Sequence, residues 1–122
     1  MLLFTVGLSI AAAPSQNLTG YCDYPPVFQQ SILADQMWLC DGARLSPTAF
    51  TFDLPTSGTI TYEGRREGDR LHVDRLVFDP GTSREAAGDC QVDRIAGKPT
   101  VVACLAEVDG RFHAVNFVVS GG

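Results

Sequence analysis

The most charged stretch of the chain lies at residues 65–70 and has the sequence Arg-Arg-Glu-Gly-Asp-Arg. An arginine guanidinium can bind a carboxylate through two parallel hydrogen bonds, so Arg65, Arg66 and Arg70 carry a chemistry suited to recognition. Residues 64–69 are polar and separate two apolar runs, which predicts an exposed hairpin loop, where binding residues often collect. We therefore take the three arginines as candidate binding residues. The alternative is a solvated hairpin tip with no binding role.

The two histidines are weaker candidates. His72 and Asp74 lie on one side of a predicted strand, as a metal pair or an acid–base pair would. Two groups are too few for a metal site, and any strand with one face in water presents such a row. His113 shares a strand face with Val115 and Phe117. A lone histidine on an apolar face is most simply interpreted as a hydrogen-bonded core residue.

No motif in the sequence has the spacing of a catalytic or metal-binding site. There is no Gly-x-Ser-x-Gly nucleophile motif, and the loop at residues 79–85 lacks the ligand spacing of a calcium loop. Five carboxylates could converge in space as the acid and base of a glycoside hydrolase, although no spacing singles them out: Glu63, Glu67, Asp69, Asp74 and Asp79. The sequence therefore predicts no catalytic residue, no metal ligand and no cofactor.

The cysteines predict two structural disulfides. Their number is even and none of them forms a Cys-x-x-Cys pair, which is typical of an exported, disulfide-bonded domain: Cys22, Cys40, Cys90 and Cys104. If residues 90–94 pair with residues 100–108 so that Arg94 lies opposite Thr100, then Cys90 lies opposite Cys104. This register leaves Cys22 and Cys40 to form the second bridge.

The start of the chain has the composition of a signal peptide. Residues 2–10 are mostly apolar and are followed by Ala11-Ala12-Ala13, as a hydrophobic region is followed by a cleavage site. The run is too short for a membrane-spanning helix. We expect a signal peptide at residues 1–15, one disulfide-stabilised domain at residues 16–122, and a secreted or periplasmic location. The alternative is an apolar first strand or a buried helix.

The elements that would position these residues are mostly short strands. A helix is expected at residues 27–34 and a strand at residues 37–40; the alternative for this segment is a strand that ends at Cys40 before an Asp41-Gly42 turn. Further strands are expected at residues 48–53, 59–63, 70–78, 90–94, 100–108 and 111–119. Asp109-Gly110 predicts a two-residue hairpin turn. Both faces of this last hairpin are apolar, which predicts a central position covered twice. The expected fold is mainly β: a small antiparallel β-barrel or sandwich with one short N-terminal helix.

Charge and size limit the classes of function that the chain can have. With 122 residues the chain is expected to form a single domain, and its formal net charge of -5 argues against nucleic acid or an anionic membrane as its partner. We expect a non-catalytic binding or inhibitory module that contacts a protein or another component of the cell envelope. The alternatives are a structural or assembly component of the envelope, and a small hydrolase that uses dispersed carboxylates.

Two segments resemble parts of the periplasmic lysozyme inhibitors. Residues 38–42, Trp-Leu-Cys-Asp-Gly, are similar to their cysteine-led strand, and residues 57–62, Ser-Gly-Thr-Ile-Thr-Tyr, are similar to their Ser-Gly loop. The tyrosine falls one residue later than in that pattern, and nothing outside these segments corresponds. The resemblance therefore implies an exported, disulfide-bonded β domain and assigns no role to any residue.

Overall fold

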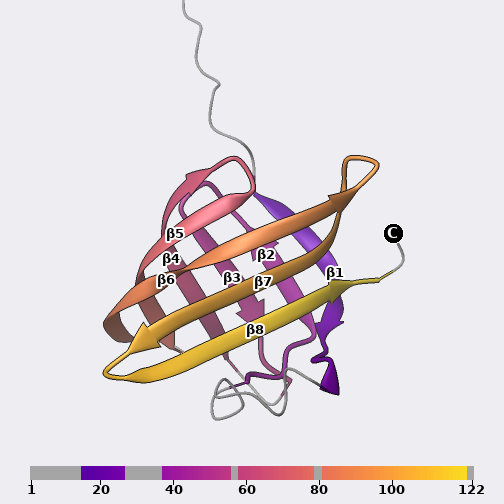
Figure 1. Ribbon diagram of the computed structural model, residues 1–122. Helices are drawn as coiled ribbons and strands as arrows, with labels where there is room; N and C mark the ends of the chain where they lie inside the picture. The colour runs from indigo at the N-terminus through magenta and orange to yellow at the C-terminus, as the bar shows by residue number, and fades with distance from the viewer. Residues whose placement is uncertain (1–14, 27–36, 56–57, 79–80, 121–122) are drawn as a thin grey trace, which may run out of the picture.

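The computed structural model describes residues 15–26, 37–55, 58–78 and 81–120. They form a closed antiparallel barrel in which each strand pairs with the next and β8 pairs with β1 (Figure 1). The strands are β1 (Gln16–Cys22), β2 (Gly42–Leu45), β3 (Ala49–Asp53), β4 (Thr59–Glu67), β5 (Arg70–Phe78), β6 (Thr82–Ile95), β7 (Lys98–Val108) and β8 (Arg111–Val119). Closure pairs the first and last strands with each other, so the sheet has no long free edge.

Tight turns connect the longest strands. Asp109 and Gly110 both have positive φ, 52° and 81°, as a two-residue turn between twisted antiparallel strands requires, so the predicted hairpin is confirmed. Ala96 and Gly97 form an equivalent turn between β6 and β7, with φ of 53° and 81°. These turns hold neighbouring strands in one register along most of their length.

The interior of the barrel is filled by side chains. An eight-stranded barrel leaves a core just wide enough for one set of inward-facing residues. The largest fully buried side chains are Tyr62, Phe50, Phe52, Phe117, Leu45, Ile60, Leu71, Leu76, Val92, Val102, Val115 and Cys90. They alternate along the strands with more exposed residues, so each strand gives one face to the core and one to the outer wall.

Both predicted disulfides are confirmed. Cys22 bonds Cys40, with 4.9 Å between their Cα atoms, and Cys90 bonds Cys104 across β6 and β7, with 4.0 Å between theirs. Two disulfides fit an oxidising compartment. The predicted signal peptide lies almost wholly outside the described residues.

The N-terminal part differs most from expectation. The helix expected at residues 27–34 lies outside the described residues, and the described ones contain no helical element that supports it. The strand expected at residues 37–40 is wrong, because Met37 forms only an isolated bridge with Ala114 of β8. No helix in the described ranges is long and apolar enough to cross a membrane. The sequence reasoning also missed β1 and β2, which are short and partly polar.

Several strands are longer than predicted. Residues 64–67 belong to β4 rather than to a hairpin loop, and the tip is the two-residue turn Gly68-Asp69. The pairing of β4 with β5 shifts at a bulge after Glu63. The residue after the bulge is glycine, and a side chain there would clash with the carbonyl oxygen of His72. A second bulge after Asp93 places Arg94 opposite Pro99 rather than Thr100.

The predicted double covering of the last hairpin is also wrong. One face of β7 and β8 lines the barrel interior, and the other face forms outer wall. Val101, Leu105, Phe112 and Val118 lie there and are partly exposed. A closed barrel buries one face of each strand, and scattered apolar residues are tolerated on a protein surface.

Candidate binding surface at the charged end of the barrel

One end of the barrel carries the β4–β5 tip, the β6–β7 tip and the turn between β2 and β3, and we call it the charged end. In Figure 1 the β4–β5 and β6–β7 tips lie at the top, and the β7–β8 tip lies at the other end. Backbone hydrogen bonds join these parts: the Val92 N–H donates to the Asp69 carbonyl, and the Gly64 N–H donates to the Thr48 carbonyl. Backbone hydrogen bonds therefore hold the parts of the charged end together.

Arg66 lies at the mouth of the barrel rather than on its outer wall. It is opposite Leu71, whose side chain is fully buried, and opposed residues share a face. Its guanidinium carbon lies 5.2 Å from the ring centroid of Phe50, which is also fully buried. The Arg66 Nε–H donates to the carbonyl oxygen of Gly68 at 2.8 Å. These contacts fix the guanidinium over the end of the core.

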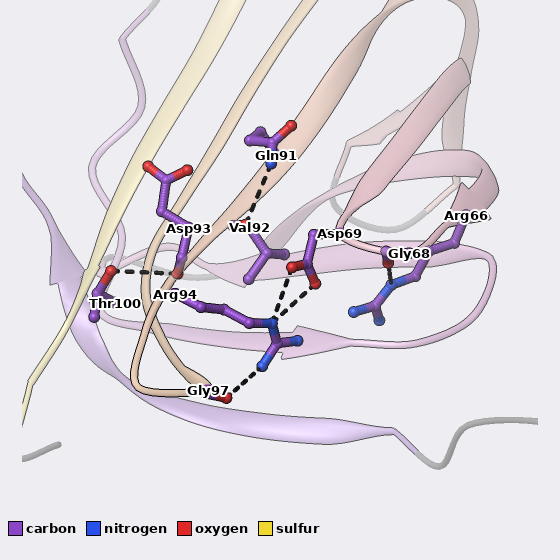
Figure 2. Close-up of polar contacts among 9 residues, drawn as sticks. All are labelled: Arg66, Gly68, Asp69, Gln91, Val92, Asp93, Arg94, Gly97 and Thr100. Carbon is purple, nitrogen blue, oxygen red and sulfur yellow. Dashed lines mark hydrogen bonds and ion pairs between the residues drawn. The ribbon is translucent and has the colours of Figure 1, made fainter.

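Arg94 reaches the same mouth from β6. Its Nε–H donates to both carboxylate oxygens of Asp69 at 3.0 Å, and Nη1 donates to the Gly97 carbonyl at 3.0 Å. Figure 2 shows the guanidinium between these two partners, with Arg66 on the other side of the Gly68-Asp69 turn. The side chains of Arg94 and Asp69 are 32% and 37% exposed, so solvent screens the pair, and it stabilises the fold by about 1 kcal/mol at most.

The two arginines line an open hollow of about 360 Å³, together with Pro47, Gly68 and Asp69. We call it the Arg66–Arg94 hollow. Within the described chain, no hydrogen-bond partner is found for either Nη group of Arg66 or for Nη2 of Arg94. Asp69 neutralises one of the two charges. The hollow therefore keeps one uncompensated positive charge and several N–H donors available to a ligand.

The structure separates the three predicted binding arginines. Arg65 is exposed and lies opposite His72. Nη1 of Arg70 lies 3.7 Å from Oδ1 of Asp89, so both arginines belong to the outer wall. Consecutive residues of a strand point to opposite faces, and Arg65 and Arg66 are therefore divided once residues 64–67 are part of β4. Arg66 is instead brought together with Arg94, which the sequence reasoning missed. The signal that could have identified Arg94 is the inward-facing alternation of Cys90 and Val92, which Arg94 continues two residues later.

His72 is part of an outer-wall cluster. Its Nε2 lies 2.7 Å from Glu67 and its Nδ1 lies 3.3 Å from Asp89. Hydrogen bonding by His72, together with the charges of His72 and Arg65, holds the pKa of the Glu67 carboxyl below its usual range. Within the described ranges, no group of three or more candidate ligands could hold a metal ion. The cluster is an exposed ion-pair network.

The carboxylates considered for hydrolysis have different partners. Glu67 contacts His72 on the outer wall, whereas Asp69 contacts Arg94 at the mouth. Asp74 is exposed on β5, and Asp79 lies outside the described residues. Glu67 and Asp69 thus do not form a facing pair.

His113 lies at the opposite end of the barrel, and we call this the aromatic end because Tyr24, Trp38 and Phe78 gather there. His113 is 8% exposed, and its Nδ1 accepts a hydrogen bond from Trp38 Nε1 at 3.2 Å. Its ring stacks on Trp38 and meets the Phe78 ring edge-on. The interpretation of His113 as a hydrogen-bonded core residue is confirmed.

No protein-family model matches the chain, and no curated protein or solved structure is significantly similar to it. The likeness to periplasmic lysozyme inhibitors stays confined to the two segments named above. The function is therefore inferred from the geometry of the barrel itself.

Proposed function

We propose that this protein is an exported, non-catalytic binding module that holds a protein partner of the cell envelope at the charged end of its barrel. The Arg66–Arg94 hollow would receive an acidic side chain of that partner. The candidate signal peptide at residues 1–15 and the two disulfides support export.

The filled interior supports recognition at the surface. Phe50, Tyr62 and Phe117 are fully buried inside the barrel, where a ligand-carrying barrel would have a cavity. A ligand must therefore meet the ends or the outer wall. The strands and tight turns keep the charged end in a fixed geometry, so little conformational entropy is lost when it binds.

The observation that carries the proposal is the set of unpartnered guanidinium donors in the Arg66–Arg94 hollow. Arg66 is oriented by Phe50 and Gly68, and Arg94 by Asp69 and Gly97, before any partner arrives. Both guanidinium groups keep N–H donors free, and a carboxylate can accept two of them at once. Although the chain has a net charge of -5, the Arg66–Arg94 hollow is therefore a local site for an acidic group.

The test compares two double variants that remove the same charge. Arg66→Ala with Arg94→Ala empties the hollow, whereas Arg65→Ala with Arg70→Ala removes two arginines from the outer wall. Each variant, and the wild type, is used to capture proteins from the native envelope fraction, followed by quantitative mass spectrometry. We expect the first variant to lose the partners that the wild type and the second variant retain.

Because both variants lower the net charge by two, long-range electrostatics affects them equally and only the position of the arginines differs. Both should fold, since exposed charges usually change stability by no more than about 0.5 kcal/mol, and the cation–π contact of Arg66 and the Arg94–Asp69 pair each add about 1 kcal/mol at most. Full retention of partners by the first variant contradicts the proposed site. Loss in the second variant alone would move the binding surface to the outer wall.

A further inference from the structure

A second hollow of about 340 Å³ opens at the aromatic end, between the β5–β6 and β7–β8 hairpins. Phe78, Thr82, Val108, Arg111 and His113 contribute to its lining. We call it the His113 hollow. Arg111 and His113 lie two residues apart on β8, opposite the buried Val108 and Ala106. Both side chains therefore continue the inward-facing row of β8 to the aromatic end of the barrel.

The contact with Trp38 fixes the position of the proton on His113. An indole N–H only donates, so the Nδ1 atom that receives it from Trp38 carries no hydrogen. Burial, and then the charge of Arg111, lower the pKa of His113. The ring is therefore neutral at neutral pH, and its one remaining proton lies on Nε2.

Nε2 of His113 is accessible and has no partner in the described chain. No group of the described chain hydrogen-bonds this atom. Among the described residues, every buried side-chain nitrogen or oxygen atom has a partner, so an atom without one cannot be sealed inside the protein. The residue as a whole is more than nine-tenths buried, and it lines this hollow. A nearly buried ring that lines the hollow thus carries one N–H donor without a partner in the described chain.

The hollow also carries a positive charge that no group of the described residues neutralises. Arg84 donates to the Asp109 carboxylate at 2.9 Å, so these two charges cancel. Arg111 has neither an ion pair nor a hydrogen bond within the described ranges, and its charge acts on His113. The Phe78 ring and the Val108 side chain supply apolar surface beside these donors.

We propose that the His113 hollow is a binding site for a small organic carboxylate with an apolar body. The carboxylate would accept hydrogen bonds from His113 Nε2 and from the Arg111 guanidinium, and the apolar body would pack on Phe78 and Val108. Two donors beside one free positive charge match the two oxygens and the charge of a carboxylate. A metal cation does not fit, because the only exposed nitrogen of His113 is protonated.

The test uses cyclohexanecarboxylate as the probe, because it absorbs little light where tryptophan does. Trp38 is the only tryptophan of the chain and contacts His113, so its fluorescence and its single indole N–H resonance report on the site. Cyclohexanecarboxamide is the uncharged control. We expect a saturable response to the carboxylate and none to the amide.

Arg111→Ala should weaken the binding of cyclohexanecarboxylate at least about tenfold, as loss of a charge-assisted hydrogen bond does. The matched variant is Arg75→Ala, which removes one arginine from β5, where Arg75 contacts Ser83 and not the hollow. It should bind the probe as the wild type does. An equal Kd in Arg111→Ala and wild type, or an equal response to carboxylate and amide, would overturn the site.

The outcome is independent of the function proposed for the charged end. Arg111→Ala leaves Arg66 and Arg94 in place, so it should still capture the envelope partner. Likewise, the Arg66→Ala, Arg94→Ala variant should still bind cyclohexanecarboxylate with the wild-type Kd.

Discussion

The charged end and the aromatic end of the barrel are closed by different kinds of interaction. At the charged end, Arg66 rests on the Phe50 ring and Arg94 pairs with Asp69, and the ion pair is partly exposed. At the aromatic end, the buried hydroxyls of two tyrosines and the partly buried indole of Trp38 donate to distant parts of the chain, and the Cys22–Cys40 disulfide follows Trp38 in sequence. The solvent-screened ion pair positions side chains and leaves some of their N–H donors free. The buried hydrogen bonds instead tie separate backbone segments to one another.

The hydrogen bonds of the aromatic end connect segments far apart in the sequence. The hydroxyl of Tyr62 donates to the carbonyl oxygen of His113 at 3.0 Å, across the barrel interior. The hydroxyl of Tyr24 lies within hydrogen-bonding distance of the carbonyl oxygens of Trp38 and Ala114 and can donate its one hydrogen to either. Burial raises the pKa of Tyr24 to about 12 and that of Tyr62 well above its usual value, so both remain protonated donors. We infer that this end supplies most of the stability, whereas the charged end is the one proposed to hold the envelope partner.

The largest expected effect comes from Tyr62→Phe. It deletes one oxygen from the core and leaves the His113 carbonyl without this donor, which should lower the free energy of unfolding by about 1–3 kcal/mol. Tyr21→Phe is the matched control, because Tyr21 is 50% exposed and its hydroxyl can be replaced by water without loss. Urea denaturation measures both. Equal stability of the two variants would break the contrast between the ends.

The strands that face water on one side were predicted best. The bounds of β5 and β8 match residues 70–78 and 111–119. Apolar residues alternate with polar ones along most of β5, and the Asp109-Gly110 turn marks where β8 begins. The disulfides followed from the register of β6 and β7, which the bulge after Asp93 leaves unchanged at Cys90 and Cys104. In contrast, β1 and β2 contain glycine and polar residues and are defined by their long-range pairing, which the sequence pattern does not show.

The candidate sites required information that local patterns lack. Arg65, Arg66 and Arg70 are close in sequence, but the extension of β4 to Glu67 puts Arg66 alone at the mouth. Arg94 reaches it because β6 pairs with β5 and so runs beside the β4–β5 tip. The contact of His113 with Trp38 spans 75 positions and lies beyond any local pattern.

A second prediction concerns pH and acts at the aromatic end only. The pKa of His113 lies below its ordinary value of 6.5 in the folded protein, chiefly because of burial and also because of Arg111. The unfolded chain therefore binds this proton more readily. The contribution of His113 to stability is complete above about pH 6.5 and is lost as the pH falls through the lowered folded pKa.

Urea denaturation at a series of pH values from about 8 to about 5.5 measures this loss. His113→Asn keeps an oxygen that can accept the Trp38 bond but removes the titrating ring, so its stability should fall less over the same range. His72→Gln changes the exposed histidine that contacts Glu67 and Asp89 on the outer wall, and the same pH series on this variant separates the contribution of that cluster. The opposite result, with His72→Gln alone flattening the profile, would assign the pH dependence to the outer wall.

The smallest expected effect on stability comes from Asp69→Asn at the charged end. The Arg94–Asp69 pair is about one-third exposed, so its loss should cost no more than about 1 kcal/mol. The backbone carbonyl of residue 69 would still accept from the Val92 N–H, and asparagine is well tolerated in a two-residue turn. Urea denaturation should thus place this variant close to wild type.

The same substitution should strengthen binding at the charged end. Without the Asp69 carboxylate, the Arg66–Arg94 hollow gains one net positive charge, and Arg94 Nε becomes available to a ligand. Capture of the envelope partner should then persist to a higher salt concentration than with wild type, because the hollow attracts an acidic group more strongly and more salt is needed to screen that attraction. Asp53→Asn is the matched control, since its contact with Arg44 at 4.0 Å lies outside the hollow. If Asp69→Asn instead unfolds the domain, or binds more weakly than Asp53→Asn, the ion pair is structural and the division of roles between the two ends is wrong.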